Sequence, residues 1–212
     1  MTANAVRSAF SASLASCREH ESELGQLDSV AGDGDHGSGM VRGFTAACSA
    51  ITGLEEADSA LITAAGTAFA DAAGGASGAL WGVFVQTIGK ALGEGAITPS
   101  RVVVALRSGE AEIERIGKSK PGDKTMLDTL VPFLDELHGR VSGGSTLSEA
   151  WTGALVVARE ATAATSKMVA KRGRSAVLGE RSLGTVDPGA RSLLCVLEAV
   201  LPVISSEGTE RP

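Results

Sequence analysis

Apolar residues recur along most of this chain with the spacing of an amphipathic α-helix. In residues 4–23 the side chains of Val6, Phe10 and Leu14 fall on one stripe, which is the roughly 3.6-residue period of a helix with one buried face. The same period predicts seven more helices, over residues 38–53, 57–72, 79–92, 100–116, 125–140, 147–171 and 188–204. Segments rich in Gly or Pro separate these stretches, and no stretch alternates convincingly as a strand would. The pattern predicts an all-α chain with one domain over residues 1–204 and a frayed tail at 205–212.

Composition supports a single helical domain and argues against one class of function. The chain has 212 residues, of which 43% are hydrophobic but only 3% aromatic, and it has no Tyr. At this length a core built from Ala, Leu, Val and Ile can be buried without cross-links. The net charge of −6 argues against nucleic-acid binding, because that function needs a basic surface.

The cysteines and the N-terminal segment indicate a compartment. Cys17, Cys48 and Cys195 are scattered and form no Cys-x-x-Cys pair, which is typical of thiols in a reducing environment. The first 25 residues are interrupted by polar and acidic side chains, unlike a signal peptide, and no apolar run reaches membrane-spanning length. We therefore expect a cytoplasmic protein with no membrane partner.

The most informative segment is an acidic loop expected at residues 25–37. Asp28, Asp33 and Asp35 stand among small residues, with Gly at positions 32, 34, 37 and 39. Such a loop can bend until the three carboxylates converge, and converged carboxylates repel one another unless a cation lies between them. Oxygen-only ligands suit Mg²⁺ or Ca²⁺, and glycines let backbone approach a phosphate closely. The loop therefore predicts a metal and phosphate site.

Other interpretations of the acidic loop remain open at this point. Acidic, glycine-containing loops are common on protein surfaces, where Asp caps helices and Gly makes turns. An EF-hand fits poorly, because no Glu stands twelve positions into a loop that starts at Asp28 or Asp33. The Walker A pattern G-x-x-x-x-G-K-[ST] is absent from the chain.

Three further loops carry unusual chemistry, and a closed bundle of alternating helices would place all four at one end. The loop at residues 74–78 offers Ser77 and several backbone N–H groups before a helix, an arrangement that can bind phosphate. The loop at residues 122–126 opens another helix with polar residues, and the one at 173–190 includes Arg174 and Arg181. Taken singly, each is also compatible with an ordinary N-cap or a solvated surface arginine.

Together these segments resemble a known family. DSVAGDGDHGSGMVRGF (28–44), GGASGALWG (74–82), PGDKTMLDTL (121–130) and GRSAVLGERSLGTVDPGARS (173–192) are similar, in order and spacing, to the DhaL-type nucleotide-binding subunit of dihydroxyacetone kinases. The same domain forms the C-terminal half of the single-chain, ATP-dependent kinases. The resemblance implies a barrel of eight antiparallel helices with its nucleotide site in the loops at one end.

The resemblance also implies the ligands of that site. ADP or ATP would be held with two Mg²⁺ ions, and the metal ligands would be Asp28, Asp33 and Asp35. With Arg174, these acids would also form the catalytic set. The implied nucleotide-binding residues are His36, Gly37, Ser38, Gly39, Ala76, Ser77, Gly117, Thr125, Met126, Arg174, Asp187, Pro188 and Gly189. At Gly39 the chain departs from the family, which often has Asn there, so that a polar contact to the nucleotide or its metal would be missing unless Ser38 compensates.

The family pattern further implies partners. Its kinases hold the ketone on a His of a separate substrate-binding part, and nothing in this sequence corresponds to that part, so we expect a DhaK-type partner. The predicted function is a phosphotransferase that acts on dihydroxyacetone or a related ketose such as erythrulose. Its bound ADP would be rephosphorylated by a DhaM-type phosphocarrier of the sugar phosphotransferase system, or ATP would exchange at each turnover.

Three alternatives remain from the sequence. An ADP-loaded form could bind a transcription regulator, a role that the family supports. The chain could belong with related kinases that act on fatty acyl groups, although no further domain of theirs is present. It could also be a structural all-α protein whose acidic loop is stiffened by Ca²⁺, in which case nucleotide would have no effect on its stability.

Overall fold

The computed structural model describes residues 3–30 and 32–208, apart from the side chains of residues 3, 174, 175, 178, 207 and 208. Within these ranges the chain is helical and contains no strand, as the period of its apolar residues predicts. The α-helices are α1 (Ala3–Glu19), α2 (Glu21–Ser29), α3 (His36–Ile51), α4 (Asp58–Ala73), α5 (Gly75–Leu92), α6 (Pro99–Gly117), α7 (Leu127–Ser142), α8 (Leu147–Ala164) and α9 (Pro188–Gly208). Two 3₁₀ segments, η1 (Thr165–Lys167) and η2 (Arg174–Ser182), lie between α8 and α9.

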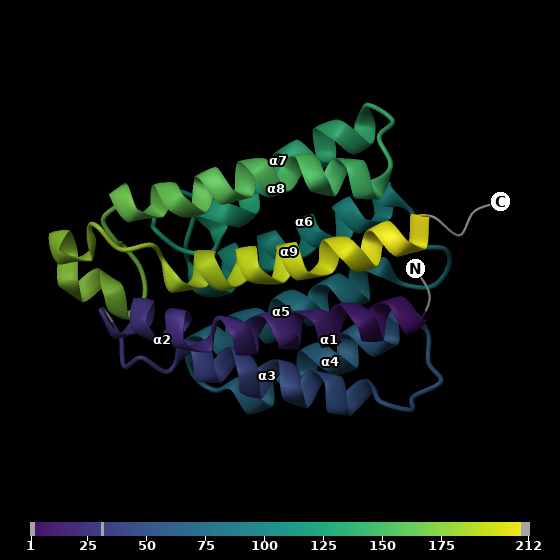
Figure 1. Cartoon of the computed structure of the whole chain (residues 1–212), viewed down its shortest axis with the longest axis horizontal. Coiled ribbons are helices and arrows are strands. Elements are labelled where there is room, and N and C mark those ends of the chain that lie inside the picture. Colours follow the sequence, from purple (N-terminus) through teal and green to yellow (C-terminus); the bar gives the residue numbers. More distant parts are fainter. Residues whose placement is uncertain (1–2, 31, 209–212) are drawn as a thin grey trace.

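Eight of these helices close into a ring. Each packs on the next in the order α1, α3, α4, α5, α6, α7, α8 and α9, and α9 returns to pack on α1. Successive helices run in opposite directions, while α2 continues from the end of α1 and packs on α3 and α9 (Figure 1). The expected barrel of eight antiparallel helices is confirmed, with α2 as an addition.

Small side chains let the helices approach closely, and a few aromatic side chains fill the space that remains. A Cβ at Gly82 of α5 would lie 2.4 Å from the Cβ of Ala70 on α4, so the packing of α5 on α4 depends on Gly at this contact. Phe44 and Phe69 meet edge to face with ring centroids 5.1 Å apart, and Trp81 packs on both. The ring is not completely filled, because an apolar cavity of about 170 Å³ remains inside it.

Several helix ends differ from the sequence expectation. The helix expected over residues 4–23 is divided at His20, and α2 extends far enough to carry Asp28 in its last turn rather than in a loop. The Gly-rich segment after Gly74 is the first turn of α5, and the helix expected to reach residue 171 ends at Ala164. These differences share a cause, since apolar periodicity marks the buried face of a helix but not its last turns. At the C-terminal end α9 continues to Gly208, beyond the expected end at residue 204, and residues 209–212 lie outside the described part of the chain.

Helix α9 also corrects the expectation about apolar runs. The stretch Pro188–Ser206 is long and apolar enough to cross a membrane by length and composition alone. In the structure the helix packs against α1, α8 and α7, and its Leu193 and Cys195 are buried. A core helix of a closed ring passes the same test of length and composition, so its role here is to complete the barrel.

Candidate functional site

Three carboxylates converge where the chain passes from α2 into α3. Asp28 lies in the last turn of α2, Asp33 lies in the connecting loop, and Asp35 stands just before α3. One oxygen from each carboxylate lies within 4.8 Å of the others. The convergence that the sequence predicts is therefore present, and it is made by a helix end and a helix start rather than by one continuous loop.

Two glycines make this approach possible. Gly34 has a φ of +78°, a conformation that L side chains rarely adopt, and its N–H donates to Asp28 Oδ2 at 2.9 Å. A Cβ at Gly32 would lie 2.4 Å from Asp28 Oδ1. The local chain therefore wraps around the Asp28 carboxylate and fixes its orientation.

The first turn of α3 follows directly. His36 is buried, and its Nε2 lies 2.9 Å from Ser192 Oγ on α9. The hydroxyl of Ser38 donates to the Asp35 carbonyl and accepts from Arg42, whose guanidinium also reaches the Ala73 carbonyl. His36 thus joins the acidic turn to α9, and the Ser38 side chain already has partners within the protein.

The start of α5 lies beside this turn. Ala76 and Ser77 are exposed in its first helical turn. Gly39 and Ser77 line a small cleft between α3 and the start of α5. A Cβ at Gly39 would lie 3.3 Å from the Ala73 carbonyl oxygen, so a larger side chain here would have little room on this side.

The loop between α6 and α7 is built around two buried carboxylates. Asp128, in the first turn of α7, accepts the N–H groups of Gly122 and Thr125 at 2.5 and 2.7 Å, which ties the preceding loop to the start of the helix. Asp123 accepts from the Lys120 N–H at 3.2 Å and pairs with Arg172. Burial alone would raise the pKa of Asp123, but these two partners outweigh it, so its pKa lies below the usual value.

Asp187 precedes α9 and occupies the N-cap position. Its Oδ2 accepts the Ala190 N–H at 2.8 Å, and its own N–H donates to Thr165 Oγ1 at 3.0 Å. Burial raises the pKa of Asp187 to about 7, and the nearby Asp128 carboxylate acts in the same direction. The bond from Ala190 and the charge of Lys124 oppose this rise. Asp187 is therefore a tightly held acid whose ionisation depends on its neighbours.

These elements enclose a cavity of about 440 Å³ at one end of the barrel. The predicted residues that line it are Asp28, His36, Ala76, Ser77, Gly117, Thr125, Met126, Asp187, Pro188 and Gly189. Among the remaining predicted residues, Asp35 and Gly39 line the adjoining cleft. The side chain of Arg174 lies outside the described part of the structure.

The cavity has neighbours that the sequence analysis missed. Leu80, Ile113 and Ile116 form an apolar patch near Met126, and Lys124 and Arg172 add cationic groups. Lys124 belongs to a segment already singled out, but its burial depends on contacts with residues more than 40 positions away. The cavity therefore joins an apolar surface, two cations and one edge of the acidic cluster, which suits a ligand with a flat apolar part and an anionic part.

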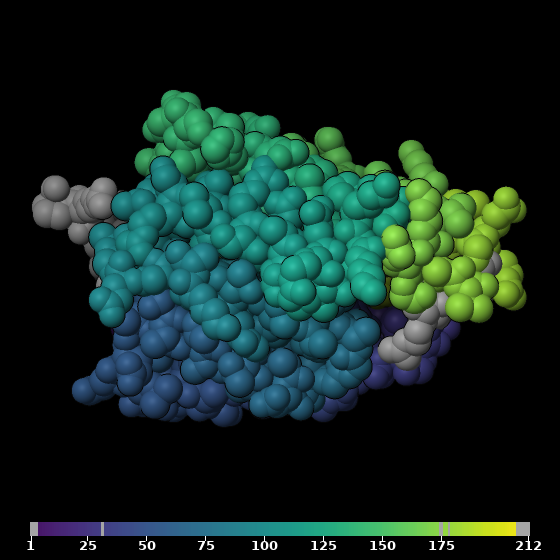
Figure 2. Space-filling model, turned by 180° about the vertical axis from the view of Figure 1, so that it is seen from behind, coloured from purple at the N-terminus to yellow at the C-terminus, as the bar shows by residue number. Residues whose placement is uncertain are grey.

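The end of the molecule that carries this cavity is distinct from the other end. In Figure 1 α2 and the segment between α8 and α9 lie together at one end, and both chain termini lie at the opposite end. Figure 2 shows the same segment, in yellow-green, standing beside the loop before α7 when the molecule is seen from behind. The four chemically unusual loops thus meet at one end of the barrel, as the alternation of helices predicts.

The acidic cluster fits a divalent cation. Mg²⁺–oxygen distances of about 2.1 Å place opposite ligands about 4.2 Å apart, and the three carboxylate oxygens lie within 4.8 Å of one another. This spacing is close enough for Asp28, Asp33 and Asp35 to share a bound cation, whose charge would offset their mutual repulsion. Carboxylate-only donors suit hard cations such as Mg²⁺, Ca²⁺ or Mn²⁺.

Comparisons with known proteins agree with this geometry. The chain matches the DAK2 domain over residues 30–202. It is 42% identical to an L-erythrulose kinase of Pectobacterium atrosepticum over 98% of this chain but 36% of that protein. It is 36% identical to the ADP-binding subunit DhaL of a PEP-dependent dihydroxyacetone kinase of Listeria innocua, with 87% of this chain and 88% of that subunit covered.

A solved structure shares the fold of this chain. The dihydroxyacetone kinase of C. freundii in complex with AMP-PNP and Mg²⁺ superposes with a TM-score of 0.69 at 28% identity, over 93% of this chain and 33% of that one. The chain spans about a third of the erythrulose kinase and of the C. freundii enzyme, and most of the length of the DhaL subunit. The helical ring, the loop end and the sequence agreement together place this chain in the DAK2 domain family.

Proposed function

We propose that this chain is the nucleotide-binding part of a kinase that phosphorylates dihydroxyacetone or a related short ketose such as erythrulose. The observation that carries the proposal is the position of the acidic cluster, because Asp28 lines the same cavity as Ser77 and Thr125. A metal-binding group next to a cavity with polar groups and an apolar patch is what a magnesium–nucleotide complex requires.

The residues of the chain have separable tasks in this proposal. Asp28, Asp33 and Asp35 would hold two Mg²⁺ ions, whose positive charge would neutralise the phosphates during transfer. The N-terminus of α5, with the Ser77 hydroxyl, offers donors to a phosphate. The apolar patch around Met126 and Ile116 would receive the adenine ring, and Arg174 would contact phosphate oxygens.

The names of the relatives support the substrate class. They include erythrulose kinases and the ADP-binding subunits of dihydroxyacetone kinases. In our proposal the ketose is held by a DhaK-type partner and receives the phosphoryl group across an interface. The partner, and not this chain, would then decide which ketose is used.

Two sources of the phosphoryl group are compatible with this site. In one, ADP stays bound and a DhaM-type phosphocarrier rephosphorylates it, a version favoured by similarity to subunits named as PEP-dependent and ADP-binding. In the other, ATP exchanges at each turnover, a version favoured by the AMP-PNP complex of a structural relative. A regulatory role, in which the ADP-loaded protein binds a transcription regulator, would use the same nucleotide site, and a pull-down that separates kinase partners from regulators would test it.

Native mass spectrometry of gently purified protein, with and without EDTA, tests the proposal. A mass increase of one ADP and two Mg²⁺ that disappears on chelation supports the bound-cofactor version. Protein that is free of nucleotide until MgATP is added supports the exchanging version. Protein that takes up no nucleotide under either condition contradicts the proposed function and favours an ion-stiffened structural protein instead.

A further inference from the structure

A loop that begins with two adjacent basic residues, Lys171 and Arg172, is clamped against the segment before α7. Lys124 is buried at a φ of +62°, and its ammonium donates to the carbonyls of both Met168 and Ser182. These two carbonyls stand at the two ends of the loop 169–181, so one side chain closes the base of that loop. The Ala170 N–H also donates to Ser182 Oγ at 2.9 Å.

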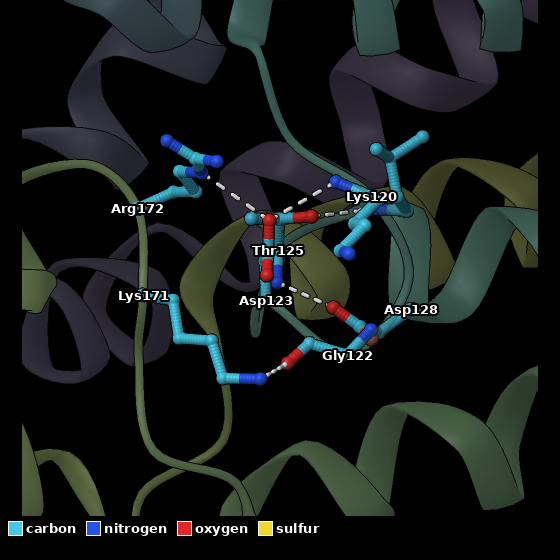
Figure 3. Close-up of polar contacts among 8 residues, drawn as sticks. Lys120, Gly122, Asp123, Thr125, Asp128, Lys171 and Arg172 are labelled. Carbon is cyan, nitrogen blue, oxygen red and sulfur yellow. Dashed lines mark hydrogen bonds and ion pairs between the residues drawn. The ribbon is translucent and has the colours of Figure 1, made fainter.

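A second set of contacts fixes the first residues of the same loop. The Asp123 carbonyl accepts the Lys171 N–H at 3.0 Å, and the Lys171 ammonium donates to the Gly122 carbonyl at 2.9 Å. The Asp123 carboxylate accepts from Arg172 Nε at 3.2 Å. Figure 3 shows Lys171 and Arg172 approaching the Gly122–Asp123 segment from the same stretch of backbone.

The ion pair with Asp123 orients the Arg172 guanidinium and leaves part of it exposed. The Asp123 side chain is 4% exposed and that of Arg172 is 50% exposed, so a buried carboxylate holds one edge of a guanidinium that remains half open. The contact with Asp123 uses Nε rather than either of the two terminal nitrogens. Two terminal N–H₂ groups in a fixed plane match two oxygens of a phosphate.

Lys124, the other cationic residue that lines the cavity, is less suited to contact an anionic ligand. The Lys124 ammonium is buried among backbone carbonyls, whereas Arg172 lines the cavity with half of its side chain exposed. Since Asp28 and Asp187 line the same cavity, a cationic side chain such as Arg172 would reduce the repulsion that these carboxylates exert on an anionic ligand.

We propose that Arg172 is a further phosphate-binding residue of this cavity and that Asp123 positions it. The inference rests on the nucleotide binding proposed above. Arg172 contacts the anionic part of the bound nucleotide, and Asp123 holds the guanidinium in the orientation that this contact needs. The clamp formed by Lys124 keeps the loop in place around both.

The test compares Arg172→Gln with Lys171→Gln. Both changes remove one positive charge and one tie to the 122–123 segment, but Lys171 does not line the cavity. Isothermal titration with MgADP and with adenosine separates phosphate contacts from contacts to the base and ribose. We expect Arg172→Gln to weaken MgADP about tenfold, the scale of one charge-assisted hydrogen bond, and to leave adenosine unchanged. Lys171→Gln should bind both as the wild type does.

The outcomes distinguish the two proposals. If the wild-type protein does not bind MgADP, the proposed function fails and this inference fails with it. If the wild type binds MgADP and Arg172→Gln binds equally well, only the inference is overturned. Equal loss of MgADP and adenosine affinity, or equal loss in Lys171→Gln, also overturns it, because the role would then be structural.

A double-mutant cycle with Asp123→Asn tests the positioning role. Asp123→Asn should weaken MgADP severalfold in the wild-type background and have little further effect once Arg172 is Gln. Circular dichroism should match wild type, and the thermal midpoint should fall only slightly, since Asn retains an acceptor for the Lys120 N–H but loses the charge that pairs with Arg172. Full loss of affinity in both backgrounds would show that Asp123 acts independently of Arg172.

Discussion

The loops that connect the helices differ between the two ends of the barrel. At the end that carries the chain termini, the loops 52–57, 93–98 and 143–146 contain no buried residue. Their helices are capped by exposed side chains, such as Thr98 on the Arg101 N–H and the reciprocal pair of Thr146 and Glu149. At the cavity end Asp123, Lys124, Asp128 and Asp187 are all buried.

The difference indicates which end is shaped by a ligand. Reversing a helical hairpin needs only turns and caps, which the exposed loops supply. Burying a charged side chain is unfavourable unless it is well paired. Loops that only connect antiparallel helices do not require buried charges, yet four charged side chains are buried at the cavity end. The buried charges at the cavity end instead hold loops at fixed positions around a space. Changes at the two ends should therefore separate ligand binding from stability.

The largest expected effect comes from the acidic cluster. Asp33→Asn should weaken MgADP binding by at least about 100-fold, because outer-shell changes at metal sites already cost about 10- to 100-fold. The same change removes one of three neighbouring negative charges, so it should not lower the free energy of unfolding of the ligand-free protein. Titration calorimetry and urea unfolding measure the two quantities.

The matched control for Asp33→Asn lies at the other end. Glu56→Gln removes a carboxylate from the exposed loop 52–57 and should change neither quantity. If Asp33→Asn bound MgADP as tightly as Glu56→Gln does, the acidic cluster would not be the metal site.

Much of this arrangement was predictable from local sequence. The apolar period gave the helices of the ring, and the spacing of Asp28, Asp33 and Asp35 was enough to expect their convergence, which the structure confirms. Most of the predicted nucleotide residues line the cavity, but they were chosen through family resemblance, and their roles as ligands remain predictions.

The features that were missed depend on distant contacts. A Lys before a helix and an Arg in a basic loop are usually solvated, and nothing local to Lys124 or Arg172 shows that the two loops meet. The break at His20 was missed for a related reason. The hydrogen bonds from His20 to Ser16 and from Leu24 to His20 continue through the break, so the apolar stripe is hardly disturbed.

The second expected effect is a pH dependence confined to the cavity end. The pKa of Asp187 is raised to about 7 in the folded protein, above its value of about 3.9 in an unfolded chain. The folded state therefore binds more protons than the unfolded state between these values, and the free energy of unfolding should fall as pH rises from 5 to 7. The slope should be at most about 1.4 kcal/mol per pH unit.

Asp187→Asn should flatten this dependence in the ligand-free protein. Urea unfolding at several pH values between 5 and 8 measures it. Asp128 and Lys124 face the same carboxyl group, and they shift the midpoint in opposite directions without reversing the sign. A slope that persists unchanged in Asp187→Asn would assign the proton to another group.

The smallest expected effect belongs to the opposite end. Thr146 caps α8 by accepting from the Glu149 N–H, while the Glu149 carboxylate accepts from the Thr146 N–H at 2.9 Å. Thr146→Ala should lower the free energy of unfolding by about 1 kcal/mol, the usual effect of losing an N-cap. It should leave the affinity for MgADP unchanged, because Thr146 does not line the cavity. A loss of MgADP affinity in Thr146→Ala, measured by titration alongside urea unfolding, would mean that the two ends are coupled through the helices, and the separation between a binding end and a capping end would not hold.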